Sequence, residues 1–273
     1  LGTAVGASIE GLKPIAEIMF SDFMFVALDQ IINQAANVRY VSNGLASAPL
    51  VVRTQQGVTP GSCAQHSQCI EAHLANVPGI KVGLPITPND AYAMLRAAIS
   101  DPDPCIIIEA RSAFTRKGEV VIGGAIEFAE GARWVRDGKD VGIICWGTSV
   151  VEAEMAAAAL AAQGISVAIL DLRWLSPIDD RAIAELVAKC DQILVVHEAS
   201  QTGGFGAEIA ARIQERHSAE LKGPVLRLAG LDVRMPASPI LQRQVVPSAE
   251  RIRARVQEMV SVEVQNGRTS AVA

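Results

Sequence analysis

The chain has 273 residues, of which 50% are hydrophobic but only 4% aromatic, and its formal net charge is −5 at pH 7. This length predicts about two domains, with cores built from Ala, Val, Ile and Leu. The acidic charge excludes the basic surface of a nucleic-acid-binding protein, and the longest apolar run, residues 155–162, is far shorter than the ~20 residues of a membrane span.

The first residues and the cysteines indicate whether the chain is a fragment and in which compartment it occurs. Leu1 stands where a start methionine is expected, and the residues after it have a mid-helix pattern, so we expect a fragment. No signal-peptide pattern opens the chain. Five cysteines without a C-x-x-C motif favour reduced thiols in a cytoplasmic protein.

Short apolar runs alternate with helical patterns in the first part of the chain. Each run is unbroken and bounded by polar, Pro or Gly residues, which is typical of strands buried on both faces of a parallel sheet. The predicted strands are residues 14–19, 50–53, 80–83 and 105–109, and the predicted helices are residues 22–37, 65–76 and 88–100.

A second alternating series follows a connector at residues 111–133, where the periodicity is weak. Its predicted strands are residues 141–145, 166–171, 192–196 and 225–229, and its predicted helices are residues 150–163, 179–189, 204–216 and about 248–260. Such repetition implies right-handed crossovers and ligands at the carboxyl ends of the strands. The sequence therefore predicts an α/β fold of two open parallel-sheet, three-layer domains.

One histidine lies where a ligand could bind. A loop with Gly57, Pro60 and Gly61 precedes the predicted helix that would carry His66 at its start. A helix N-terminus presents unpaired N–H groups that favour a polar ligand, and an imidazole there could exchange a proton with a substrate. From spacing alone, a histidine that caps its own helix is the more frequent alternative.

Aromatic and methionine side chains gather after the first predicted strand, at Met19, Phe20, Phe23, Met24 and Phe25. They are either a platform for a flat heterocycle or ordinary core packing, and core packing is the more common arrangement. Their position after the carboxyl end of a strand favours a pocket.

Two further motifs could bind a ligand or could have a purely structural role. The helix end at residues 98–104 combines free carbonyls with Asp101 and Asp103, which could hold a hard cation, although an acidic turn is more common. The run Gly203-Gly204-Phe205-Gly206 lacks the G-x-G-x-x-G spacing. It favours close packing of a helix on a strand, or a subunit contact, over a phosphate site.

Several long segments together identify a family. They include Gly11-Leu12-Lys13-Pro14, Ala27-Leu28-Asp29-Gln30, Gln65-His66-Ser67-Gln68, Arg173-Trp174-Leu175-Ser176-Pro177 and Gly203-Gly204-Phe205-Gly206-Ala207-Glu208. From about Leu1 to Val260 the chain resembles the β subunit of the thiamine-diphosphate-dependent decarboxylase component of 2-oxo acid dehydrogenase complexes, of the pyruvate, branched-chain 2-oxo acid or acetoin type.

This resemblance implies a domain plan and partners. It implies a transketolase-like pyrimidine-binding domain at residues 1–118, a linker at 119–138, a transketolase C-terminal domain at 139–262 and a disordered tail at 263–273. An α subunit would hold the diphosphate and Mg²⁺ in an α2β2 heterotetramer, and a lipoyl acyltransferase would accept the acyl group. The family's activating glutamate falls just before Leu1, so we expect the chain to lack its N-terminus and to be inactive alone.

The resemblance also implies site residues. Met19 and Phe23 would contact the aminopyrimidine, and His66 would face the lipoyl arm and assist proton transfer during acyl transfer. A structural monovalent cation, typically potassium, would be surrounded, largely through carbonyls, by Leu50, Ala98, Ile99, Asp101 and Asp103. The protein would be cytoplasmic, or in the mitochondrial matrix of a eukaryote.

Departures from the family pattern leave the substrate open between a 2-oxo acid and acetoin. His73 and Ala237 stand where the family has large aromatic residues, and Phe114 stands where Tyr is common. Two alternatives also stay open: a non-catalytic dimerisation and docking chain, or part of a longer single-chain transketolase-like enzyme.

Overall fold

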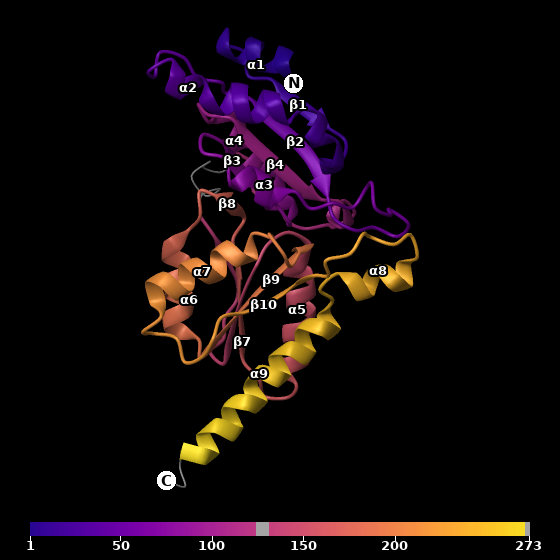
Figure 1. Ribbon diagram of the computed structural model, residues 1–273, viewed down its shortest axis with the longest axis vertical. Helices are drawn as coiled ribbons and strands as arrows, with labels where there is room; N and C mark the ends of the chain where they lie inside the picture. The colour runs from indigo at the N-terminus through magenta and orange to yellow at the C-terminus, as the bar shows by residue number, and fades with distance from the viewer. Residues whose placement is uncertain (124–130, 271–273) are drawn as a thin grey trace. The chain divides into compact units, whose positions relative to one another are not determined.

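The computed structural model describes residues 1–123 and 131–270, with side chains up to residue 261 in the last helix. The chain forms two compact units (Figure 1). The N-terminal unit comprises Leu1–Gly131, Arg173–Ile178 and Arg234–Gln242, and the C-terminal unit comprises Ala132–Leu172, Asp179–Val233 and Arg243–Ala273.

The sheet of the N-terminal unit has the strand order β1-β2-β4-β3-β8. Its strands are β1 (Ile15–Ile18), β2 (Val51–Gln56), β3 (Lys81–Gly83), β4 (Cys105–Ala110) and β8 (Trp174–Ser176). The first four are parallel, as predicted, while β8 runs antiparallel to β3. The apolar residues of the central strands are buried, as at Val51 and Val52 of β2 and Ile106–Ile108 of β4, and this explains why their runs are recognisable in the sequence.

The helices of the N-terminal unit correct two predictions. The predicted helix at residues 22–37 is a series of short turns: η1 (Ser21–Val26), η2 (Gln30–Gln34) and η3 (Ala35–Asn37), followed by α2 (Val38–Val41). The predicted helix at residues 65–76 is reduced to α3 (Glu71–Ala75). In both segments, side chains of polar residues bond to the other segment and compete with helical turns.

Two other helices complete this unit. These are α1 (Gly2–Ile9) and α4 (Pro88–Ser100), with a short 3-10 turn η4 (Arg111–Ala113) after β4. Helix α4 matches its predicted bounds because both a capping side chain and a proline mark its first turn. Thr87 Oγ1 accepts a hydrogen bond from Asp90 N at 3.0 Å, and Pro88 occupies the first helical position.

The sheet of the C-terminal unit has the order β10-β9-β6-β7-β5. Its strands are β5 (Arg133–Arg136), β6 (Val141–Cys145), β7 (Val167–Asp171), β9 (Gln192–Ser200) and β10 (Leu226–Gly230). The four predicted strands are present and parallel, and β5 is antiparallel to β7. Part of the predicted linker therefore belongs to this sheet, while its residues 124–130 lie outside the described residues.

Helices cover both faces of this second sheet. They are α5 (Thr148–Ala161), α6 (Asp180–Lys189), α7 (Gly206–His217) and α9 (Ala249–Ser270). Helix α8 (Pro239–Val245) precedes α9 in the chain and belongs to the N-terminal unit up to Gln242. Helix α5 packs with α9, and α6 packs with α7 on the other side of the sheet (Figure 1). Helix α9 continues past the predicted end near residue 260, and residues 271–273 of the predicted tail lie outside the described residues.

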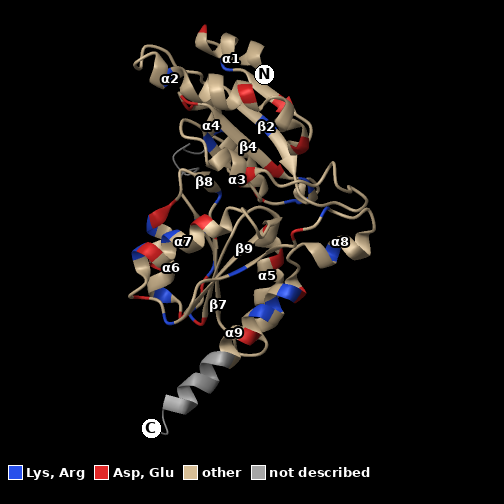
Figure 2. Ribbon diagram, in the orientation of Figure 1, with Lys and Arg blue, Asp and Glu red and all other residues tan. Residues whose placement is uncertain are grey.

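Charged residues of both signs alternate over α6 and α7 (Figure 2). Arg212 forms ion pairs with Asp180 and Glu208, each at 3.0 Å, so neighbouring charges compensate one another.

Both sheets of the molecule are parallel sheets with one antiparallel edge strand, and the predicted α/β class is confirmed with that correction. Within residues 1–123 and 131–270, no helix is long and apolar enough to cross a membrane.

Candidate functional site

His66 lies in the loop between β2 and α3, with its ring packed against two phenylalanines. Its ring is edge-on to Phe20 and to Phe23, at centroid distances of 4.4 and 5.6 Å. The two phenylalanine rings are themselves edge-on at 5.9 Å, so three rings form one T-shaped cluster. The predicted position of His66 at a helix start is wrong, because α3 begins five residues later, at Glu71.

The aromatic run after β1 divides between core and surface. Met24 is completely buried, whereas Met19 is 58% exposed and Phe23 is 41% exposed. Core packing therefore holds for Met24, while the platform for a heterocycle stays a prediction for the exposed residues. Met19 and Phe23 present apolar surface, with Phe23 packed against His66, and such a surface can pack on the flat face of a pyrimidine ring.

Three neighbouring strands supply this cluster at their carboxyl ends. Met19 follows β1, and its carbonyl accepts a hydrogen bond from the side-chain amide of Gln55 on β2. Arg111 follows β4, and its guanidinium lies 5.0 Å from the centre of the Phe20 ring. Ligands of parallel sheets bind at this edge, so the location agrees with a binding site.

Hydrogen bonds fix the loop on both sides of His66. Ser67 Oγ donates to the carbonyl of Cys63 at 2.7 Å, and Gln68 bonds with Ser21 and Asp22 of η1. Sequence reasoning missed Ser21, Asp22 and Arg111. The available signal was Asp22 itself, the one charged residue among residues 18–28, because a carboxylate in an apolar stretch needs a partner.

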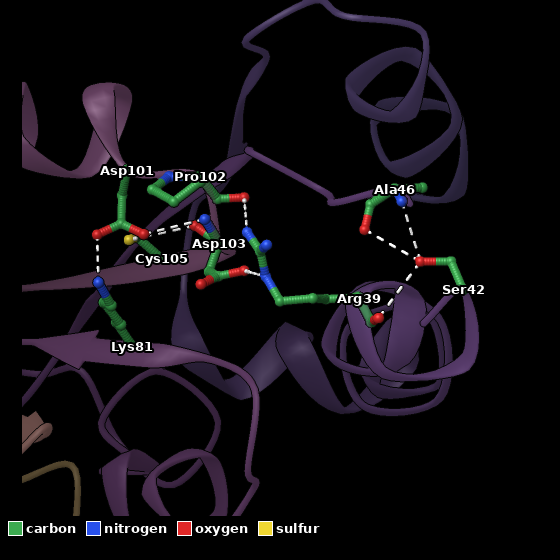
Figure 3. A network of polar contacts seen from close by, with 8 residues as sticks. All are labelled: Arg39, Ser42, Ala46, Lys81, Asp101, Pro102, Asp103 and Cys105. Atoms are coloured by element: carbon green, nitrogen blue, oxygen red, sulfur yellow. Dashed lines mark hydrogen bonds and ion pairs between the residues drawn. The ribbon is translucent and has the colours of Figure 1, made fainter. Parts of the chain in front are cut away.

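The two carboxylates of the predicted cation site, Asp101 and Asp103, have basic partners within the chain (Figure 3). Asp101 forms an ion pair with Lys81, and Asp103 forms one with Arg39 at 2.6 Å. Burial acts to lower the pKa of Lys81, but its hydrogen bond and charge interaction with Asp101 raise it overall. Both carboxylates are therefore already neutralised.

The backbone oxygens of this segment are also engaged. The carbonyl of Leu50 accepts from Cys105 N at 3.0 Å, and the carbonyl of Ile99 accepts from Lys13 Nζ at 2.9 Å. Ala98 is buried beside them. These partners occupy one acceptor position on each of these two carbonyls, and the potassium site stays a prediction. Among the residues whose side chains are described, no cluster of His, Cys, Asp or Glu could hold a metal.

A groove of about 1030 Å³ opens beside the same ion pairs, lined among others by Arg39, Tyr40, Lys81 and Asp103. Lys81 and the nearby Cys105 begin β3 and β4, so the groove lies at the amino ends of these strands. His66 and its aromatic neighbours lie at the carboxyl ends. The groove is therefore separate from the candidate site.

The second motif of interest, Gly203–Gly206, packs against a buried histidine of β9. His197 is fully buried and stacks on Trp146, with centroids 5.3 Å apart and planes 4° apart. A Cβ on Gly204 or Gly206 would lie 2.5 or 2.3 Å from the His197 ring. These glycines therefore permit close packing, as the sequence favoured. Burial lowers the pKa of His197 to about 4, and the charge of Arg227 acts in the same direction.

Comparisons with known proteins cover nearly the whole chain. The family described as "Transketolase, pyrimidine binding domain" matches residues 1–117, and "Transketolase, C-terminal domain" matches residues 130–252. Among solved structures, a split gene transketolase described as an inactive beta4 tetramer superposes with a TM-score of 0.75 at 24% identity, over 95% of this chain and 80% of that one. That likeness supports the fold.

Curated relatives are more similar in sequence. The acetoin:2,6-dichlorophenolindophenol oxidoreductase subunit beta of Cupriavidus necator is 42% identical over 93% of this chain and 75% of its own length. The 2-oxoisovalerate dehydrogenase subunit beta of Bacillus subtilis is 38% identical over 94% and 80%. The pyruvate dehydrogenase E1 component subunit beta of Rhizobium meliloti is 39% identical over 92% and 55%.

Proposed function

Because the chain belongs to the β subunits of the thiamine-diphosphate-dependent component of 2-oxo acid and acetoin dehydrogenase complexes, we propose that His66, Met19 and Phe23 form its part of the reaction site. The T-shaped cluster of His66 with Phe20 and Phe23, beside the exposed Met19, is the observation that carries this assignment. It combines an apolar wall with a group that can move a proton.

Met19 and Phe23 would bind and orient the aminopyrimidine ring. Their exposed apolar surface is available for packing, and the hydrogen bond from Gln55 fixes the backbone at Met19. When bound, thiamine diphosphate supplies the electron sink for cleavage of the bond next to the substrate carbonyl. The chain's own part is to orient the ring and to exclude water from its face.

His66 would act in acyl transfer to the lipoyl group. As the lipoyl disulfide opens, one sulfur takes the acyl group and the other becomes a thiol that needs a proton. A half-buried imidazole packed edge-on against two rings can supply that proton from one ring nitrogen. The substrate class, a 2-oxo acid or acetoin, depends on a pocket that a partner subunit completes.

The partners follow from the family. Its β subunits work with an α subunit and with the acyltransferase of their complex. We extend this to an α2β2 heterotetramer in the cytoplasm, with the diphosphate and Mg²⁺ on the α subunit. Relatives from Oryza sativa and Drosophila melanogaster are named mitochondrial, so a eukaryotic source would place the protein in the mitochondrial matrix. The proposed domains are residues 1–118 and 139–262.

The test is an assay of the full-length protein, with the family's activating glutamate, together with its α partner. We expect reduction of a dye acceptor that requires thiamine diphosphate, measured with acetoin and with several 2-oxo acids in parallel. The chain alone should give no turnover. A stable complex that binds the acyltransferase but never turns over any of these substrates would favour the non-catalytic docking chain instead.

A further inference from the structure

The loop that carries His66 is tied to η1 through one residue, Gln68. Asp22 Oδ1 accepts hydrogen bonds from Gln68 N at 3.3 Å and from Gln68 Nε2 at 3.0 Å. Ser21 Oγ donates to the carbonyl of Gln68 at 2.7 Å. Both backbone groups and the side-chain amide of Gln68 are therefore held by two adjacent residues.

This attachment is buried and partly charged. Ser21 is completely buried, and Asp22 is only 9% exposed. Hydrogen bonds to an ionised carboxylate are stronger than those between neutral groups, and buried backbone groups outside regular structure need such side-chain partners. Gln68 also accepts from Arg234 through Oε1 at 3.3 Å, so the amide is oriented from both sides.

The same two segments carry the reaction groups. Phe20 and Phe23 lie on either side of Ser21 and Asp22, and His66 lies two residues before Gln68. The hydrogen bonds of Gln68 therefore fix the distance between the imidazole and the aromatic wall. Ser67, between the two, is anchored separately to Cys63. A shift of about 1 Å between a catalytic group and its target is enough to lower a rate roughly a hundredfold.

We infer that Asp22 and Gln68 are a positioning pair that sets the orientation of His66 toward the lipoyl group. The inference rests on the proposed function of His66. Neither side chain needs to touch the substrate. Loss of the pair should slow lipoyl acylation more than it slows reduction of an artificial dye, because the dye does not require the proton that His66 supplies.

Exchanging donor and acceptor tests the pair directly. Gln68→Glu places a carboxylate against the carboxylate of Asp22 and removes the Nε2 donor. Asp22→Asn alone keeps an oxygen that can accept from Gln68 N. The double variant Asp22→Asn/Gln68→Glu restores a hydrogen bond with the roles reversed. Gln68→Ala removes the hydrogen bond between the Gln68 side chain and Asp22 without adding a like charge. It replaces Gln68→Glu as the test variant if Gln68→Glu does not fold.

The measured quantity is the ratio of lipoyl acylation to dye reduction in the complex with the α partner and thiamine diphosphate. We expect Gln68→Glu to lower this ratio about tenfold or more, Gln68→Ala about threefold, and the double variant to recover most of the loss. The control is Asp29→Asn, which removes an exposed carboxylate bonded to Gln30 and Asn33. It should leave the ratio unchanged.

Two results would overturn the inference. One is an equal fall of both activities in Gln68→Glu or Gln68→Ala, which indicates a merely structural role. The other is a double variant that is no better than Gln68→Glu. Wild-type protein without thiamine-dependent dye reduction would instead overturn the proposed function, and the inference with it, so the two failures are distinguishable.

Discussion

Among the histidines that pack on aromatic rings, His66 and His197 do so in opposite surroundings. His66 lies in a loop, half-buried and edge-on to Phe20 and Phe23. His197 lies inside β9, fully buried, and stacks face to face on Trp146. Aromatic contact therefore does not distinguish a reaction site from a core. Access of solvent to the imidazole distinguishes them.

The backbone around each histidine reinforces this difference. Gly204 and Gly206 bring main chain against the His197 ring and leave no room for a further atom. The His66 loop is held by side-chain hydrogen bonds from Ser67 and Gln68, which fix the loop without covering the ring. His197 is therefore enclosed, whereas the His66 ring stays partly exposed.

The largest effect is expected for His66→Ala. Removal of a general acid slows its step by about 10²–10⁴-fold, so lipoyl acylation should fall in that range while dye reduction falls far less. His73→Ala is the matched control, because His73 is edge-on to Phe25 at 5.5 Å in the same unit. Rates of lipoyl acylation and of dye reduction, measured in parallel for both variants, test the role of His66. An equal loss in both assays would contradict the assigned role.

The pH dependence of unfolding tests the buried histidine. The pKa of His197 is about 4 in the folded protein, below its ordinary 6.5, so the unfolded chain binds the extra proton as the pH falls below 6.5. Stability should therefore decline between pH 6.5 and 4 by about 3 kcal/mol, of which about 2 kcal/mol is lost by pH 5. Urea unfolding at pH 7 and pH 5 measures this difference.

The control for that measurement is His197→Gln, whose side chain does not titrate. The variant should be less stable at pH 7 but should lose less stability between pH 7 and pH 5 than the wild type. An unchanged pH dependence in the variant would assign the decline to other groups.

The glycines next to His197 give a smaller effect. Gly206→Ala would place a Cβ 2.3 Å from Cδ2 of His197, and overpacking of this kind costs roughly 1–3 kcal/mol of unfolding free energy. Gly223→Ala, in the same unit, places its Cβ in open space and should change stability by no more than about 0.5 kcal/mol. Equal stability of the two variants would show that the ring can move aside.

Local patterns predicted the central strands because buried parallel strands appear as apolar runs, as at Ile106 and Ile108 of β4. They did not predict β8, which has three residues and depends on distant contacts. Leu84 N donates to the carbonyl of Arg173 at 2.7 Å, and Arg173 forms a buried ion pair with Asp90 at 3.2 Å. Pairings between residues so distant in the chain leave no periodic signal.

The candidate site shows the same limit. Met19, Phe23 and His66 were identified through the resemblance, but the loop conformation of His66 was not. Asp22 and Gln68 are 46 residues apart, and no local rule pairs them. Their hydrogen bonds are what hold the segment out of the helix that its sequence predicts. The functional loop is therefore where local preference and tertiary contacts disagree.

The smallest effect concerns thiols, and it extends the comparison of accessible and buried groups to cysteine. Cys63 is exposed in the His66 loop, whereas burial raises the pKa of Cys190 to about 11 and of Cys105 to about 12. Burial also raises the pKa of Cys145 well above its ordinary value. At pH 8, a thiol reagent should label Cys63 rapidly and Cys69 more slowly, and should reach the three buried thiols only after unfolding. The variant Cys63→Ser should lose the rapid phase and keep its fold. Rapid labelling of Cys145 in native protein would show that the C-terminal sheet opens far more readily than its packing implies.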